Sequence, residues 1–203
     1  PPPPFFNDTA TTEIYTSDVS SAASDVYKRQ PLFNSGSADL GEGLEDIAED
    51  GDPAALASAL NSKAGVASSG IFNTPVGAGG PGPAIPGGAY EFSFTAEEGD
   101  YLSFMTMFVQ SNDLFYTFPE GGIPLFNNGN PMTGDMTSQV LLYDAGTEIN
   151  EFPGAGLNQV IRQTGADTGE EENGVVTNID NVGDGFTYPA VGDIIRVTIT
   201  PQL

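Results

Sequence analysis

The sequence predicts an all-β protein, an antiparallel β-sandwich with two short helices in an N-terminal connection. Helical periodicity is confined to residues 40–65, and long loops rich in Gly, Asn and Asp, notably residues 155–189, separate the other elements. Strand-like composition returns at regular intervals after residue 88. The segments concerned are residues 89–96, 101–110, 139–143 and 194–200. Dominant strands with helices in one connection favour two antiparallel layers.

Residues 1–30 do not share this pattern. Residues 20–30 (SSAASDVYKRQ) contain Lys28 and Arg29, two of the five basic residues of the chain, without a hydrophobic period. This stretch resembles the in-frame translation of a transposase adapter used in DNA library preparation, and residues 7–16 (NDTATTEIYT) resemble a translated flow-cell adapter. We therefore interpret residues 1–30 as a non-native adapter-derived segment, or else as a disordered arm. The domain is then expected over residues 31–203, without its first strand.

The apolar spacing after residue 31 predicts two short helices. The first has apolar residues at three- and four-residue spacing and should end near Gly51. These residues are Leu40, Leu44, Ile47 and Ala48. In the second helix, Asp52 is the expected N-cap, Pro53 the first helical residue and Gly65 the stop.

The strand segments differ in how many faces they should bury. Residues 89–96 place Tyr90, Phe92 and Phe94 on one face, as expected for a half-buried strand. Residues 101–110 (YLSFMTMFVQ) are apolar on both faces, which predicts a central strand. Residues 194–200 (IIRVTIT) are rich in β-branched residues and should form the last strand.

Composition excludes several functional classes. The chain has no Cys and no His, which removes disulfides, thiolate chemistry, the usual zinc ligands and a Ser-His-Asp triad. A net charge of −23 disfavours nucleic acid as a partner and suits divalent cations. No apolar run approaches the roughly 20 residues of a membrane span, so we expect no membrane insertion.

Three acids stand at predicted strand ends and are the candidate metal ligands. Asp113 follows the central strand, and Asp144 and Glu148 follow the next strand, with Gly146 allowing the loop between them to fold back. Loops at one end of a sandwich cluster in space, and hard oxygen ligands suit Ca²⁺. The spacing alone equally allows that these are ordinary acids of an acidic chain.

Several motifs resemble the spondin N-terminal domain family. QSNDLFY (residues 110–116) and QVLLYDAGTE (139–148) resemble stretches typical of the family. GIFNTPVG (70–77) and the C-terminal GFTYP with DIIRVTITP resemble runs found in bacterial spondin-domain proteins, and the motifs follow the same order along the chain. The resemblance implies a C2-like β-sandwich that holds Ca²⁺ through Asp113, Asp144 and Glu148. It also implies a secreted or cell-surface recognition or adhesion domain, non-catalytic, whose partner is an unidentified extracellular protein or glycan.

Two other functions compete with this one. A carbohydrate-binding module could stack sugars on Phe115, Tyr116 and Phe118, although alternating aromatics beside a strand more often fill the core. A glycoside hydrolase could use a carboxylate pair, Glu148 with Glu151 or a pair within residues 170–172. Any acidic loop offers such pairs, so the sequence favours binding over catalysis.

Overall fold

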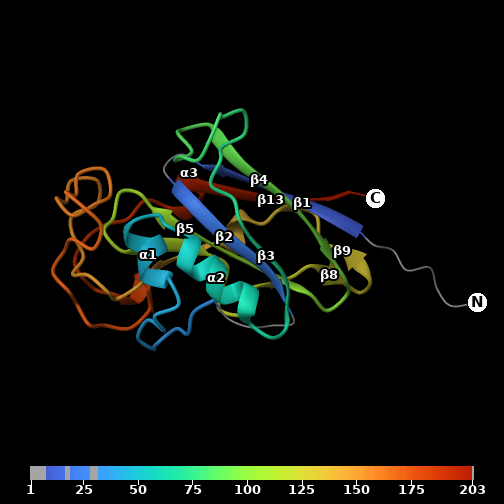
Figure 1. Ribbon diagram of the computed structural model, residues 1–203, viewed down its shortest axis with the longest axis horizontal. Helices are drawn as coiled ribbons and strands as arrows, with labels where there is room; N and C mark the ends of the chain where they lie inside the picture. The colour runs from blue at the N-terminus through green and yellow to red at the C-terminus, as the bar shows by residue number, and fades with distance from the viewer. Residues whose placement is uncertain (1–7, 17–18, 28–31, 203) are drawn as a thin grey trace, which may run out of the picture.

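The computed structural model describes residues 8–16, 19–27 and 32–202, and these form a mainly β protein (Figure 1). All strand pairings between described residues are antiparallel. The helices are short and few, as the sequence predicts. The strands form two larger sheets and one small hairpin, in which β8 (Phe126–Asn127) pairs with β9 (Asn130–Pro131).

The first sheet has four strands in the order β10-β13-β1-β4. Their bounds are Gly134–Asp135 for β10, Ile195–Gln202 for β13, Asp8–Thr16 for β1 and Gly88–Ala96 for β4. Residues 195–202 therefore form the predicted last strand. In β4, Tyr90 and Phe94 are buried and Phe92 is half-buried, so the predicted single buried face is confirmed.

The second sheet has the order β12-β11-β6-β5-β2-β3, and β7 also pairs with β5. The bounds, in chain order, are Val19–Tyr27 (β2), Val66–Ile71 (β3), Tyr101–Phe108 (β5), Leu114–Thr117 (β6), Ile123–Pro124 (β7), Leu141–Asp144 (β11) and Thr177–Asn178 (β12). Strand β5 lies inside the sheet, between β6 and β2, which confirms its predicted central position.

Strands β1 and β2 fall within residues 1–30. Strand β1 lies between β13 and β4, and β2 lies between β5 and β3, so each occupies an interior position of its sheet. The rest of that stretch lies outside the described residues. Strand pairing does not test whether residues 1–30 are translated from adapter DNA, so that interpretation stays a prediction.

One apolar cluster joins residues of both larger sheets. Phe104 and Phe108 of β5 belong to it together with Tyr90 of β4 and Val197 of β13, and all four are fully buried. Because side chains alternate along a strand, the neighbours Met105 and Met107 of β5 point to the opposite face and are also fully buried. Both faces of β5 are therefore covered.

Two helices cover this second face. Helix α1 (Leu44–Glu49) and helix α2 (Ala54–Ser62) supply Leu44, Ile47, Leu56 and Leu60 to an apolar cluster that contains Met105, Phe115 and Tyr143. The apolar spacing places Leu40 in the first helix, but Leu40 precedes α1 and is half exposed. Two glycines with positive φ, Gly41 and Gly43, delay the start of α1.

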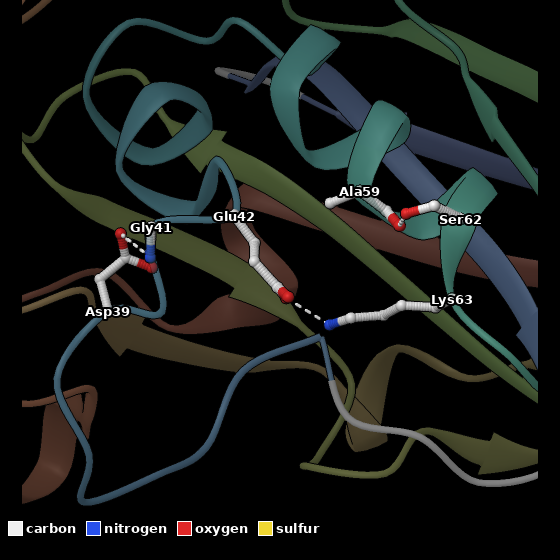
Figure 2. A network of polar contacts seen from close by, with 6 residues as sticks. All are labelled: Asp39, Gly41, Glu42, Ala59, Ser62 and Lys63. Carbon is white, nitrogen blue, oxygen red and sulfur yellow. Dashed lines mark hydrogen bonds and ion pairs between the residues drawn. The ribbon is translucent and has the colours of Figure 1, made fainter.

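Polar contacts hold the two helices and their flanks together. Helix α2 begins one residue later than predicted, with Pro53 at the N-cap position, and Asp52 Oδ1 accepts a hydrogen bond from the amide of Ala54 at 2.9 Å just before it. Figure 2 shows the ion pair between Lys63, at the end of α2, and Glu42, just before α1. The same view shows Ser62 Oγ donating to the Ala59 carbonyl at 2.8 Å and the Gly41 amide donating to Asp39 Oδ2 at 3.2 Å.

A long loop follows β11 and carries most of the irregular structure. Between Asp144 and Thr177 it contains no helix or strand, only an isolated bridge between Glu148 and Glu171. Its orange portion in Figure 1 projects beyond α1 at one end of the molecule. The chain then runs through a 3₁₀ turn (Ile179–Asn181) and helix α3 (Val191–Ile194) into β13.

Within residues 8–16, 19–27 and 32–202, no helix combines the length and the apolar character that crossing a membrane requires.

Candidate metal centre

Strand pairing brings two of the three predicted ligands together. Asp113 directly precedes β6, and Asp144 is the last residue of β11. These strands are antiparallel neighbours, and Asp144 is paired with Leu114. The amide of Ala145 donates to the carbonyl of Asp113 at 3.2 Å. The start of one strand and the end of the other therefore place both carboxylates at the same sheet edge.

The carboxylate that joins them is Glu172. One oxygen from each of Asp113, Asp144 and Glu172 lies within 4.8 Å of the other two, and we call this group the Asp113 cluster. Asp113 and Asp144 are buried, whereas Glu172 is exposed. Asp144 and Glu172 also line an open pocket of about 210 Å³. The cluster is thus accessible from solvent on the Glu172 side.

Glu172 reaches the cluster because the long loop folds back on its own beginning. Its amide donates to the carbonyl of Thr147 at 2.8 Å, and the amide of Gly174 donates to the carbonyl of Gly146 at 2.7 Å. Gly146 has φ 71°, and a Cβ there would lie 2.6 Å from the amide nitrogen of Val175. Only glycine permits this approach, which agrees with the turning role expected for Gly146.

Asp113 is bonded through only one of its two oxygens. Oδ2 accepts from the amides of Thr147 and Glu148, both at 3.1 Å, and from the Thr147 hydroxyl at 3.4 Å. Oδ1 is buried without a hydrogen-bond partner, and the whole residue is 0 % exposed. An anionic oxygen buried without a partner is costly, so this atom is suited to a cation.

Asp144 is held by two donors. The amide of Gly146 donates to Oδ1 at 2.6 Å, and the Asn150 side chain donates to Oδ2. The amide oxygen of Asn150 is itself buried without a hydrogen-bond partner. Asn150 therefore adds a further unpaired oxygen next to Asp144.

Burial and mutual repulsion shift the titration of the cluster. Burial raises the pKa of Asp113 well above its ordinary value, and the neighbouring charge of Asp144 raises it further. Burial also raises the pKa of Asp144 to about 6, although the donors Gly146 and Asn150 oppose this rise. A bound cation would favour the ionised forms, so the site is expected to exchange protons for metal.

Glu148, the third predicted ligand, is placed differently. Its amide contributes to the cluster by donating to Asp113, but its carboxylate accepts from Asn112 Nδ2 at 3.1 Å. A Cβ at Gly169 would lie 2.1 Å from the Glu148 carboxyl carbon, so the loop backbone packs directly against this carboxylate. Its role as a metal ligand stays a prediction.

Asn112 is a residue that the sequence does not single out, yet it fixes residues 148–151 near the start of the long loop. Its Nδ2 also donates to the carbonyl of Ile149 at 2.9 Å, and its Oδ1 accepts from the amide of Glu151 at 3.1 Å. The signal that could have indicated it is its position beside Asp113 at a strand boundary.

The aromatic residues considered for sugar stacking are inside the protein. Phe115, Tyr116 and Phe118 are each 0 % exposed. Phe115 packs under the helices, and the other two belong to the cluster shared by the sheets. Their expected core role is confirmed, and they present no face to a ligand.

No protein-family model matches the chain, and no curated protein matches it.

Proposed function

We propose that this protein is a calcium-binding recognition or adhesion domain that acts at the cell surface or outside the cell, with a C2-like, spondin-type β-sandwich as its scaffold. The motifs around Asp113 and Asp144 that resemble spondin N-terminal domains support this proposal. The apolar cluster common to both larger sheets supports the sandwich architecture.

The observation that carries the proposal is the buried, unpaired Oδ1 of Asp113 beside two further carboxylates. Native proteins pair nearly all buried polar atoms, so a buried carboxylate oxygen without a donor, next to two further carboxylates, supports a site that can accept a cation. With no His and no Cys in the chain, every side chain that could coordinate a metal strongly does so through oxygen. Oxygen ligands from flexible loops suit Ca²⁺ better than Zn²⁺.

The site connects three segments that are distant in the sequence. Asp113 belongs to the β5–β6 turn, Asp144 to the end of β11, and Glu172 to the far side of the long loop. Neutralising their carboxylates would let the three segments stay close without mutual repulsion. The same loop exposes large apolar side chains, namely those of Ile149, Phe152, Leu157 and Ile161. An ordered loop with exposed apolar groups is suited to binding a partner protein.

Thermal unfolding in Ca²⁺ and in chelator tests the proposal. The variant Glu172→Gln removes one carboxylate of the cluster, and Glu170→Gln is the matched control, because Glu170 is an exposed glutamate of the same loop outside the cluster. We expect Ca²⁺ to raise the unfolding midpoint of the parent and of Glu170→Gln, since a ligand that binds only the folded state stabilises it. Glu172→Gln should lose most of this increase.

Adding Asp144→Asn and Glu148→Gln separates the two possible ligand sets. Loss of the Ca²⁺ response in Asp144→Asn and Glu172→Gln with retention in Glu148→Gln would assign the site to the Asp113 cluster. Loss in Glu148→Gln as well would give Glu148 the role that the resemblance implies. An equal response in every variant, or no response in the parent, would rule the site out.

A second candidate function is glycan binding, and one pocket favours it. The pocket has a volume of about 640 Å³ and is lined by residues of the 178–191 segment, among them Phe186, Tyr188 and Asp184. Tyr188 donates to Asp184 Oδ2 at 2.6 Å, and both aromatic rings are half-buried. Aromatic faces beside acceptor oxygens are common in sugar sites.

A glycan array probed with the parent and with Tyr188→Phe and Phe186→Ala tests this second candidate. Glycan binding that weakens in Phe186→Ala, with unchanged Ca²⁺ stabilisation, would assign sugar recognition to this pocket. Absence of any bound glycan would leave protein recognition as the function to pursue.

A further inference from the structure

A second acidic group lies outside the Asp113 cluster. Glu45 and Glu49 are four residues apart in α1, which puts them on the same helix face, and Asp167 of the long loop completes the group. One oxygen from each of the three lies within 4.8 Å of the other two. Glu45 and Asp167 are exposed, and Glu49 is buried.

The state of Glu49 sets this group apart from ordinary surface acids. Glu49 is only 3 % exposed, and its Oε1 is buried without a hydrogen-bond partner. The neighbouring charges that act on it most strongly are those of Glu148, Glu45 and Asp50, all of them carboxylates. A helix that only had to pack against β5 could place an apolar residue or alanine here, so the buried acid needs another reason.

The loop is fastened to α1 next to this group. The Gln163 side chain donates to Asp50 Oδ1, directly after the helix. Asp167 itself has φ 55°, a left-handed backbone conformation that is uncommon for residues other than glycine. The approach of Asp167 to two other acids is therefore part of how the loop is folded against the helix.

We infer that Glu45, Glu49 and Asp167 form a second divalent-cation site, distinct from the Asp113 cluster, that attaches the long loop to helix α1. The three ligands are carboxylates, so the expected ion is a hard cation of the Ca²⁺ class. Two exposed ligands and one buried ligand leave open positions for water, as in many loop-built calcium sites.

The two sites are neighbours. The Thr147 amide and hydroxyl donate to Asp113, and a hydrogen bond with the Thr147 side chain also acts on Glu49. The charge of Glu49 in turn acts on Asp113. Two cations held so close repel each other, so the second should bind more weakly than the first.

Calorimetric titration of the full chain with CaCl₂ tests the inference. The informative variants are Glu45→Gln and Asp167→Asn, because both change exposed residues and asparagine tolerates the left-handed conformation at position 167. Asp46→Asn is the matched control, since it removes one exposed charge from the same helix but none of the three carboxylates of the group. Glu172→Gln reports on the Asp113 cluster in parallel.

We expect two Ca²⁺ ions per parent chain and per Asp46→Asn chain. In Glu45→Gln and Asp167→Asn, one of the two should bind at least about tenfold more weakly, because losing a ligand should cost at least as much as losing a supporting contact. Glu172→Gln should weaken the other. This pattern would establish two separate sites.

Other outcomes overturn the inference in distinguishable ways. One ion per parent chain, weakened in Glu172→Gln but not in Asp167→Asn, would mean that Glu49 is simply protonated and that only the proposed function holds. One ion weakened equally by both variants would mean a single shared site. No binding at all would overturn both proposals.

Discussion

At the scale of single residues, Asp113 shows how a buried acid can be prepared for a ligand. Three donors satisfy Oδ2, and the strand pairing places Oδ1 among carboxylates where no donor reaches it. Without a cation, the folded protein either keeps an unfavourable charge there or takes up a proton, which is why the pKa of Asp113 rises. The residue therefore lowers the stability of the metal-free protein.

The variant Asp113→Asn should change the free energy of unfolding in opposite directions in chelator and in Ca²⁺. In chelator the neutral amide removes the buried charge, and we expect the free energy of unfolding to rise by about 1–3 kcal/mol, the usual cost of a buried polar group without a partner. In saturating Ca²⁺ the variant should be less stable than the parent, because it has lost a ligand. Urea unfolding in both buffers measures this, and a variant less stable than the parent in both would contradict it.

The pH dependence of the unfolding free energy of the metal-free protein should report the protonation of Glu49. Burial raises its pKa from 4.5 to about 8 in the folded state. Because the folded protein holds this proton more tightly than the unfolded chain, the contribution of Glu49 to stability is fully present below pH 4.5 and is lost as the pH rises to about 8.

Urea unfolding in chelator across this window should therefore give a steeper fall for the parent than for Glu49→Gln, which cannot ionise. Parallel curves for the two proteins would mean that Glu49 titrates normally. Ca²⁺ should flatten the parent curve if the second site exists.

The sequence indicates two of the acids that meet in the Asp113 cluster and misses the third, for physical reasons. Asp113 directly precedes β6 and Asp144 ends β11, and the pairing register of these two strands makes the two acids neighbours. Glu172 sits within three consecutive glutamates of an exposed loop, a pattern typical of a solvated segment. Its partners are chosen by backbone hydrogen bonds across the loop that no periodicity encodes.

At the scale of elements, apolar periodicity predicts a strand or a helix well where its apolar faces are buried against other elements. Strand β5 is apolar on both faces because one face meets the sheet containing β4 and the other meets α1 and α2. Apolar spacing alone extends helix α1 back to Leu40, but the glycines at 41 and 43 override it. Backbone freedom decides that boundary, and apolar spacing does not.

Two identical substitutions at different depths should separate core from surface. Phe104 is 0 % exposed and meets Phe118 edge to face at a centroid distance of 4.8 Å, whereas Phe152 is 64 % exposed. We expect Phe104→Ala to lower the free energy of unfolding by about 3–5 kcal/mol. Phe152→Ala should change it by less than about 0.5 kcal/mol. Chemical denaturation measures both, and similar losses in the two variants would contradict the assigned core.

At the scale of the whole molecule, charge and topology both constrain stability. The chain carries 28 acids against five bases, so its folded form repels itself, and carboxylates gather where the long loop meets α1 and β11. Topology adds a second constraint, because β1 and β2 occupy interior positions in the two larger sheets. Backbone pairing with both neighbouring strands defines those positions.

Removing residues 1–30 tests the importance of these two positions. Without β1, the facing edges of β4 and β13 lose their partners, and without β2 the edges of β3 and β5 do the same. Open edges in the interior of a sheet pair readily with other chains, so we expect residues 31–203 alone to aggregate or to unfold without a cooperative transition. Size-exclusion chromatography and thermal unfolding compare the truncated chain with the full one. A soluble, cooperatively folding truncated monomer would mean that residues 31–203 close their own sheets, and it would agree with the interpretation of residues 1–30 as a segment without a structural role.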